Sequence, residues 1–356
     1  MTPTQHRIFR YIWTKKQTTI KDISQNLQID SSTVSRNLKS LIDKGFVITS
    51  GELNPGSSGG RKTKLFSLNH LKYLILGLGI EQSELSMVLL DLYGNVVEKS
   101  YDLVDMKKEE IVNAICEKVR KYENLFRKIL GISIAMPGII DTQRGEIIYC
   151  AALGLERFPL LMKLREKFNF SYQIMNDANA ASAAFSNRWR NLVYFLISIP
   201  FDLRRPVGIG AGIWLNGKNF LGSNMSAGEF ELGALPPLFG DKKVKLTLKG
   251  LKKRKQLKLN EISSFLDSLV SYLTTSIYLL DPEGVVIGGD INLLPKSIHE
   301  ILIERIKERI DKRPISKTEI IIDDSGIESI AIGSAKAFLN KFMNEYDFAI
   351  KLLKGR

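Results

Sequence analysis

The amino-acid sequence predicts an α/β protein with a small helical head and a larger α/β body. Two observations lead to this prediction. Residues 1–68 hold three short helical patterns, followed by two strand-like runs that flank a Gly/Ser-rich loop. Residues 69–356 begin with three strand-like runs and continue with alternating helices and strands. We therefore divide the chain into two domains, residues 1–68 and residues 69–356.

Length and composition limit the class of protein. The 356 residues can form two or three domains with a large buried core. The chain is 44% hydrophobic and 25% charged, as is usual for globular proteins. It has neither an apolar run long enough to cross a membrane nor the apolar segment of a secretory signal. We expect a soluble, cytoplasmic protein that has no membrane partner.

Cysteine and histidine are rare. The only cysteines are Cys116 and Cys150, and none of the three histidines lies near another histidine or a cysteine in the sequence. This pattern provides neither a disulfide framework nor zinc-ligand spacing. We expect no metal and no cofactor, and we interpret both thiols as buried apolar groups.

Positive charge is concentrated in the head. The whole chain carries a formal net charge of +13, and residues 1–68 hold eleven Lys/Arg against four acidic residues. About a fifth of the chain thus carries about half of the excess charge. Such a distribution favours a polyanionic partner over a charge that serves solubility alone.

The first two helices of the head are short. Thr2 is expected to cap the first, with Pro3 at its first position and Gln5 completing a capping box. Apolar residues spaced for one helix face indicate a second helix at about 20–27, and a short connection follows at 28–30.

The third helix is expected to open with Asp30, Ser31 or Ser32 as its N-cap and to place Val34, Leu38 and Leu41 on one apolar stripe. Its other face is polar and basic: Ser32, Thr33, Ser35, Arg36 and Lys39. Two short helices joined by a tight turn, the second with such a face, are typical of a helix-turn-helix that enters the DNA major groove. A small basic helical bundle with a solvated face would show the same pattern.

A wing strengthens the DNA-binding interpretation. The strand-like runs "FVITS" and "LFSL" flank the loop "GELNPGSSGGRKTK", which together predict a winged helix. Arg61, Lys62 and Lys64 cluster where a wing would meet phosphates or the minor groove. The loop could also be a plain linker. Head and wing together predict double-stranded DNA as a partner.

The body begins with the runs "YLILGLGI", "ELSMVLLDL" and "NVVEKSYDL", the last two joined by a turn at Tyr93-Gly94. A helix is expected from about Glu109 to Lys128, then the strand "ILGISIAMPG", then alternation up to a helix that begins near Ser334. The runs "LVYFLISI" and "GVVIGG" are expected to be buried central strands.

Five motifs in order give the body a specific resemblance: "GISIAMPGIIDTQRGEI", "MNDANAASAA", "GIGAGIWLNGKNFLGSNMSAGE", "LLDPEGVVIGGDI" and "AIGSAKAF". It resembles the ROK family of sugar kinases and sugar-responsive repressors, which have two actin-like (ribonuclease H-like) lobes. The preceding winged helix, ending in "GSSGGRKTKLFSLN", resembles the repressor branch.

The resemblance implies a function. It implies a transcriptional regulator, most simply a repressor of sugar metabolism or transport genes, that binds a DNA operator as a homodimer or a dimer of dimers. A sugar or sugar derivative bound between the lobes would control it. A sugar kinase with an added head, or a regulator that has lost sugar sensing, are the alternatives.

Phosphoryl transfer is not expected. In the family's kinases, a hairpin with the pattern Asp-x-Gly-Gly-Thr lies against phosphates; the aligned residues here are Gly79-Ile80-Glu81-Gln82-Ser83. The carboxylate of Glu81 would repel phosphate, and side chains at 81 and 82 would block close backbone approach. The kinases' Gly-Thr-Gly element is also missing from "SIPFDLRRPVGIGAG". We therefore expect no enzyme activity and no catalytic residues.

Effector contacts follow from the same resemblance. It implies that Asn176, Asp177 and Glu229 bind sugar hydroxyls and that Gly138 lines the cleft through its backbone. We also count Glu231 among the effector-binding residues. Asp177 could instead serve only as a helix cap, and "SAGEFELG" only as a polar turn.

The zinc site of the family is not expected. Leu232 stands where the family has a zinc-binding His, and the family's Cys-rich stretch is replaced by a segment with nine Lys/Arg between residues 242 and 258. This segment is interpreted as a solvated face, with an auxiliary phosphate-contacting surface as the alternative.

Overall fold

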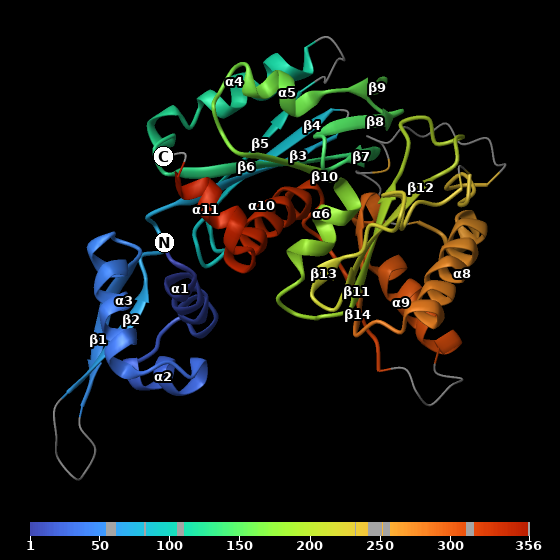
Figure 1. Ribbon diagram of the computed structural model, residues 1–356. Coiled ribbons are helices and arrows are strands. Elements are labelled where there is room, and N and C mark those ends of the chain that lie inside the picture. Colours follow the sequence, from blue (N-terminus) through green and yellow to red (C-terminus); the bar gives the residue numbers. More distant parts are fainter. Residues whose placement is uncertain are drawn as a thin grey trace.

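The computed structural model describes residues 1–54, 62–81, 83–104, 110–231, 233–240, 251, 257–310 and 317–354. Figure 1 shows a head, in blue, beside a body of two lobes with helices α6 and α10 between them. Among the described residues, no helix is both long and apolar enough to cross a membrane.

The head is a three-helix unit with a two-stranded wing. Its elements are α1 (Pro3–Lys15), α2 (Ile20–Leu27), α3 (Ser31–Asp43), β1 (Val47–Leu53) and β2 (Thr63–Leu68). The expected capping box is present, since the Thr2 side chain accepts from the Gln5 amide and the Gln5 side chain accepts from the Thr2 amide. Thr18 adds a short antiparallel bridge to Phe66 of the wing.

The first lobe is built on a five-stranded sheet in the order β10-β6-β3-β4-β5. Strands β3, β6 and β10 are parallel, whereas β4 and β5 are antiparallel to their neighbours. The strands are β3 (Leu74–Ile80), β4 (Glu84–Leu90), β5 (Val96–Leu103), β6 (Ile129–Met136) and β10 (Tyr172–Asn176). The other elements of this lobe are α4 (Ile111–Arg120), η1 (Glu123–Leu125), α5 (Leu160–Arg165), and a small sheet of β7 (Ile139–Asp141), β8 (Glu146–Cys150) and β9 (Leu155–Phe158).

The second lobe has a five-stranded sheet in the order β13-β12-β11-β14-β15. Its strands are β11 (Leu192–Ser198), β12 (Gly208–Leu215), β13 (Lys218–Asn219), β14 (Gly284–Gly289) and β15 (Glu319–Ile322). Its helices are η2 (Leu259–Glu261), α8 (Ser263–Leu280), η3 (Asp290–Leu293) and α9 (Lys296–Ile310). Strands β11 and β14 are almost wholly buried, as expected for the central strands of a covered sheet.

Helices α6 (Asp177–Ala184) and α10 (Ile327–Asn344) cross between the lobes, and α11 (Tyr346–Lys354) follows α10. The crossing depends on small residues. A Cβ added to Gly333 of α10 would lie 1.7 Å from the Ala180 carbonyl oxygen of α6. On the other side of α10, a Cβ added to Gly77 of β3 would lie 2.3 Å from the Ala331 carbonyl oxygen. Glycine is therefore required on both sides of α10 for this close backbone packing.

Two helix boundaries differ from the sequence expectations. The helix expected at 109–128 spans only Ile111–Arg120 and is followed by the 3-10 turn η1; Phe126 just beyond packs edge-on against Phe170. The helix expected near Ser334 begins at Ile327, directly after Gly326. Gly333 has poor helix propensity, so the sequence pattern did not predict a helix that begins before it. In the structure, Gly333 is required inside the helix for the close contact with α6.

The crossing can be tested with Gly333→Ala. Helix propensity alone would make this change stabilising by about 1 kcal/mol. Because the new Cβ would collide with the Ala180 carbonyl, we expect a loss of about 3 kcal/mol in the free energy of unfolding, measured by urea denaturation. Gly208→Ala is the control, since its Cβ would lie 3.4 Å from the Ser198 Cβ. Equal stability of the two variants would contradict the assigned packing.

Candidate functional sites

Helix α3 presents the polar face that the sequence predicts. Val34, Leu38 and Leu41 are buried against the head core. On the opposite face, Thr33 is half-buried and the other four predicted residues are exposed: Ser32, Ser35, Arg36 and Lys39. The polar side chains therefore point away from the packed core of the head.

The start of α3 is fixed by its cap. The Asp30 carboxylate accepts from the Ser32 hydroxyl at 2.6 Å and from the Thr33 amide at 2.9 Å, as the sequence predicts. Hydrogen bonds from Ser32 and Thr33 hold the pKa of Asp30 below its usual range. Arg36 donates to the Thr33 hydroxyl at 3.2 Å, which uses one of its donors and orients the guanidinium along the helix.

The wing places further lysines on the head surface. Lys62 and Lys64 are exposed. Lys62 Nζ lies 3.9 Å from a Glu52 carboxylate oxygen, and an exposed pair at this distance contributes little, so Lys62 can exchange Glu52 for a phosphate. Arg61, the third predicted wing residue, and most of the 242–258 segment lie outside the described residues.

Asn176 is hydrogen-bonded to a second predicted effector residue, Gly138. Its amide nitrogen donates to the Gly138 carbonyl at 3.1 Å, and its amide oxygen accepts from the Asn179 backbone at 3.1 Å. The N-cap of α6 is thus Asn176. Asp177 is the next residue and accepts from one free backbone amide, so the alternative interpretation of Asp177 as a cap is right about this hydrogen bond and wrong about the cap position. Gly138 has φ +108, and a Cβ there would lie 2.3 Å from the Tyr149 carbonyl oxygen, so this turn requires glycine.

Asp177 is a buried carboxylate at the first position of α6. One of its oxygens accepts from the Ala178 amide at 2.7 Å, and the residue is 8% exposed. Burial and, to a smaller extent, the Glu229 carboxylate raise the pKa of Asp177 to about 6, against the lowering effect of the Ala178 hydrogen bond. Partial burial of the Glu229 carboxylate also raises its pKa, although the residue as a whole is exposed. Glu229 forms a β-bridge with Gly210, and a Cβ added to Gly210 would lie 3.8 Å from the Ala178 Cβ. The backbone therefore places Glu229 close to the start of α6, where Asp177 lies.

A tight backbone contact positions Glu229. Gly228 has φ +87 and accepts from the Ala211 amide at 2.8 Å, and a Cβ on Gly228 would lie 1.8 Å from the Ala211 carbonyl oxygen. Glu229 and Glu231 are both exposed, but none of the contacts described for Glu231 reaches Asp177. Leu232 lies outside the described residues. Within the described residues, no group of three or more His, Cys, Asp or Glu is arranged to hold a metal ion.

A cavity of about 480 Å³ lies elsewhere between the lobes. None of the five predicted effector residues lines it, so this hollow and the Asp177–Glu229 pair are separate sites. Its charged lining is mainly acidic, with one lysine: Glu81, Glu84, Asp290, Glu328 and Lys99. Lys99 is itself paired with Glu328 at 2.9 Å. Burial and then a hydrogen bond with Glu84 raise the pKa of Tyr101, also in the lining, to about 12.

The space beside the altered hairpin is filled. A Cβ added to Gly79 would lie 3.0 Å from both the Ala331 nitrogen and the Ile327 carbonyl oxygen of α10. The first turn of α10 therefore occupies the position where a longer side chain at 79 would have to go. The sequence indicated that Glu81 does not suit a phosphate site. It did not reveal the cavity or the roles of Lys99 and Tyr101 in its lining, since the lining residues come from segments far apart in the sequence.

Comparison with known proteins gives separate matches for the body and for the head. Residues 75–237 match the ROK family, and residues 1–50 match the MarR family. The chain contains a ROK family domain. It is 29% identical over 222 residues to the xylose repressor of Caldicellulosiruptor bescii, a match that covers 58% of this chain and 52% of that protein. The chain thus spans about half the length of the curated relatives it matches.

Solved structures confirm the predicted fold class of a winged head and a two-lobed ROK body. A ROK family transcriptional regulator, a homologue of the Escherichia coli MLC protein, gives a TM-score of 0.75 at 16% identity and covers 99% of this chain and 98% of its own. A ROK hexokinase from Thermus thermophilus gives 0.59 at 20% identity, over 75% of this chain and 98% of its own. The ROK body therefore occurs in both regulators and kinases.

Burial of Asp177 predicts a pH-dependent stability. Its pKa is about 6 when folded and 3.8 in the reference state, so the unfolded chain releases this proton first as the pH rises. Stability is therefore lost between about pH 4 and pH 6, and Asp177→Asn removes that loss. We expect the variant to gain up to about 3 kcal/mol in the free energy of unfolding above pH 6, with no gain below pH 4.

Urea unfolding from pH 4 to pH 8 measures this difference. Asparagine can still accept from the Ala178 amide, so the local hydrogen bond is retained. Asp324→Asn, the same change at an exposed position, is the matched control. If the free energies of unfolding of Asp177→Asn and the parent protein differ by the same amount at every pH, Asp177 is not desolvated as described.

Proposed function

We propose that this protein is a DNA-binding transcriptional regulator, acting as a repressor of sugar metabolism or transport genes. The observation that supports this most directly is the exposed polar and basic face of α3 beside the lysines of the wing. A helix end with Ser, Thr and Arg side chains can read base edges in the major groove, while wing lysines contact phosphates. Residues 1–68 form the DNA-binding part of the proposal, and residues 69–356 the effector-binding and dimerisation part.

The proposed effector is a sugar or sugar derivative bound at Asn176, Asp177 and Glu229. Carboxylate and amide groups in a partly buried site accept and donate hydrogen bonds to hydroxyls, and they reject ligands that leave them unpaired. The xylose repressor relative supports a sugar by its name. Binding would shift the balance between two arrangements of the lobes in a cytoplasmic homodimer on a pseudo-palindromic operator.

A sugar kinase is the second candidate, and one observation favours it. A pKa of about 6 would suit Asp177 to act as a general base. The residues where the kinases bind phosphate do not suit it, because the charged lining of the cavity between the lobes is mainly acidic and α10 packs tightly against Gly79. Phosphoryl transfer depends on positioned phosphate contacts, so we infer binding without catalysis. ATP-dependent phosphorylation of a sugar, lost in Asp177→Asn, would establish the kinase instead.

The DNA-binding role is tested with DNA fragments selected by the full chain from random genomic DNA. We expect Arg36→Ala to weaken binding to the selected site by about 1–3 kcal/mol and to relax specificity at one position. Lys62→Ala should weaken binding to all sequences and reduce the slope of affinity against salt by about one ion. Affinity is measured by fluorescence anisotropy at several salt concentrations.

Lys296→Ala is the matched control, since Lys296 is exposed on α9, which lies away from the head in Figure 1. It should leave DNA affinity and salt slope as in the unchanged protein. If Arg36→Ala binds DNA as this control does, α3 is not part of the DNA interface.

The effector site is tested by calorimetry with a panel of mono- and disaccharides that includes xylose. Glu229→Gln should weaken binding of the active sugar at least about tenfold, because a charge-assisted hydrogen bond contributes about 1.5–3 kcal/mol. Glu231→Gln is the control, since it makes the same change two residues away and, unlike Glu229, Glu231 does not act on the pKa of Asp177. Equal losses in both variants would argue against a site at Glu229, and no heat with any sugar would argue against a sugar effector.

A further inference from the structure

Two elements run from the space between the lobes to the head. Helix α10 lines the cavity with Ile327 and Glu328 at its start, and near its end Phe342 packs against the head. The β4–β5 hairpin lines the same cavity with Glu84 and Tyr101, while its turn at 91–95 contacts the head at the other end. Lys99 of β5 and Glu328 of α10 are joined by an ion pair, so the two elements are tied together beside the cavity.

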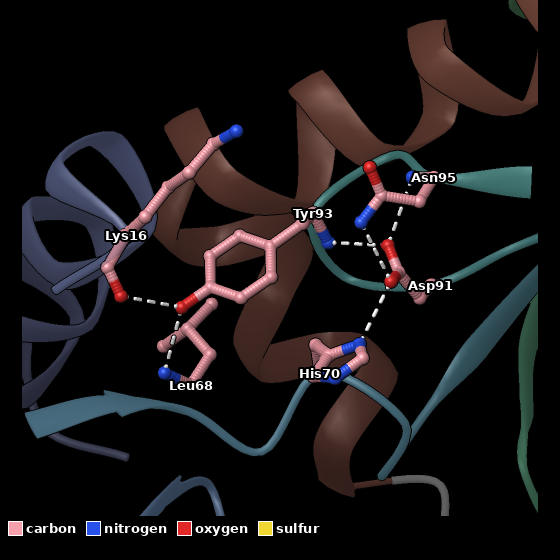
Figure 2. A network of polar contacts seen from close by, with 6 residues as sticks. All are labelled: Lys16, Leu68, His70, Asp91, Tyr93 and Asn95. Atoms are coloured by element: carbon pink, nitrogen blue, oxygen red, sulfur yellow. Dashed lines mark hydrogen bonds and ion pairs between the residues drawn. The ribbon is translucent and has the colours of Figure 1, made fainter. Parts of the chain in front are cut away.

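Tyr93, in the turn of that hairpin, binds the head through its hydroxyl. Figure 2 shows the hydroxyl accepting from the Leu68 amide at 2.9 Å and donating to the Lys16 carbonyl at 2.8 Å. Lys16 caps the end of α1 with φ +63, and Leu68 is the last residue of β2. One side chain of the body thus satisfies two backbone groups, one from a helix and one from the wing. Burial raises the pKa of Tyr93, which keeps the hydroxyl protonated as a donor.

Asp91 holds this turn in shape. Its side chain, 3% exposed, accepts from the Tyr93 and Asn95 amides at 2.8 and 2.9 Å and from the Asn95 side chain at 3.0 Å (Figure 2). It also binds His70 Nδ1 at 2.8 Å, and the His70 carbonyl accepts from the Leu92 amide at 3.0 Å. His70 lies in the connection between head and body, so the connection is bound to the turn rather than free.

Apolar packing supports the same junction. Phe9 of α1 and Phe342 of α10 make an edge-on contact with centroids 6.2 Å apart, within one buried cluster that includes residues of head and body. His6 Nε2 lies 3.4 Å from the Phe342 carbonyl oxygen, and the Tyr346 hydroxyl donates to the Met1 carbonyl at 3.3 Å. The packing attaches the head, and the directional hydrogen bonds of Tyr93 add a defined orientation.

We propose that Tyr93 is a positioning residue that fixes the orientation of the head on the first lobe. Because the hairpin and α10 both begin at the cavity between the lobes, the head then moves with the first lobe when the lobes change their arrangement. In a dimer this orientation sets the separation of the two α3 helices. The consequence for DNA rests on the proposed function, whereas the fixed orientation itself does not.

The orientation is tested with Tyr93→Phe in the full chain. The ring keeps its packing, but the Leu68 amide and the Lys16 carbonyl lose their shared partner. Spin labels placed at Lys39→Cys on α3 and at Glu117→Cys, an exposed position on α4 of the first lobe, report the distance between the head and the first lobe; both native cysteines are buried. We expect one narrow distance distribution in the parent protein and a broad or shifted one in Tyr93→Phe. Tyr101→Phe, the same change on the same hairpin without a head contact, should keep the narrow distribution.

A second measurement connects orientation to DNA. Operators selected with the parent protein are rebuilt with one or two base pairs inserted between the half-sites. We expect Tyr93→Phe to lower the preference for the selected spacing by about tenfold while Arg36-dependent base specificity is retained, since one to two hydrogen bonds are lost. A mere loss of folding would lower affinity for every spacing alike.

The outcomes separate the two claims. An unchanged label distance in Tyr93→Phe, or an equal change in Tyr101→Phe, overturns the positioning role. A changed label distance with an unchanged spacing preference also overturns the proposed link to DNA spacing. If the label distance changes as expected but the parent protein binds no DNA, the fixed orientation stands and the proposed function fails.

Discussion

The close crossing of α6 and α10 is the constraint on which the rest of the structure depends. Gly333 lets the backbone of α10 touch that of α6 at Ala180, and Gly77 lets the same helix lie on β3. A helix pinned by backbone on both faces cannot move without moving its neighbours. The N-terminus of α6 carries Asn176 and Asp177, so the predicted effector site is attached directly to this crossing.

The same packing makes phosphate chemistry unfavourable. With α10 held against β3, its first turn lies so close to Gly79 that a side chain there would require α10 to shift by a few tenths of an ångström. The adjoining cavity gathers Glu81, Glu84 and Glu328, whose charge would repel a nucleotide. The body thus has the buried Asp177, with the exposed Glu229 near it, on one side and an acidic hollow on the other. Under the proposed function, the first of these features serves ligand binding.

Local patterns predicted the parts of the fold that local physics determines. The Thr2 capping box, the Asp30 cap and the apolar stripe of α3 are set by residues three or four apart, and the strands by short apolar runs. The start of α10 could not be predicted, because Gly333 is stabilised by a partner some 150 residues away in the sequence. The head contacts of Tyr93 were missed for the same reason, since they join residues 25 and 77 positions apart.

Long-range contacts also limit how such a regulator can respond. A ligand can shift two arrangements only by the difference in its affinity for them, and a shift from 1:99 to 99:1 needs about 5.5 kcal/mol. Asp177 provides a source for part of this difference, because burial disfavours its charged form when no hydroxyl donor is present. A sugar hydroxyl donating to that carboxylate would favour the arrangement in which the bond is made. Because Tyr93 and Phe342 fix the head to the first lobe, a change in the arrangement of the lobes would also change the position of the head.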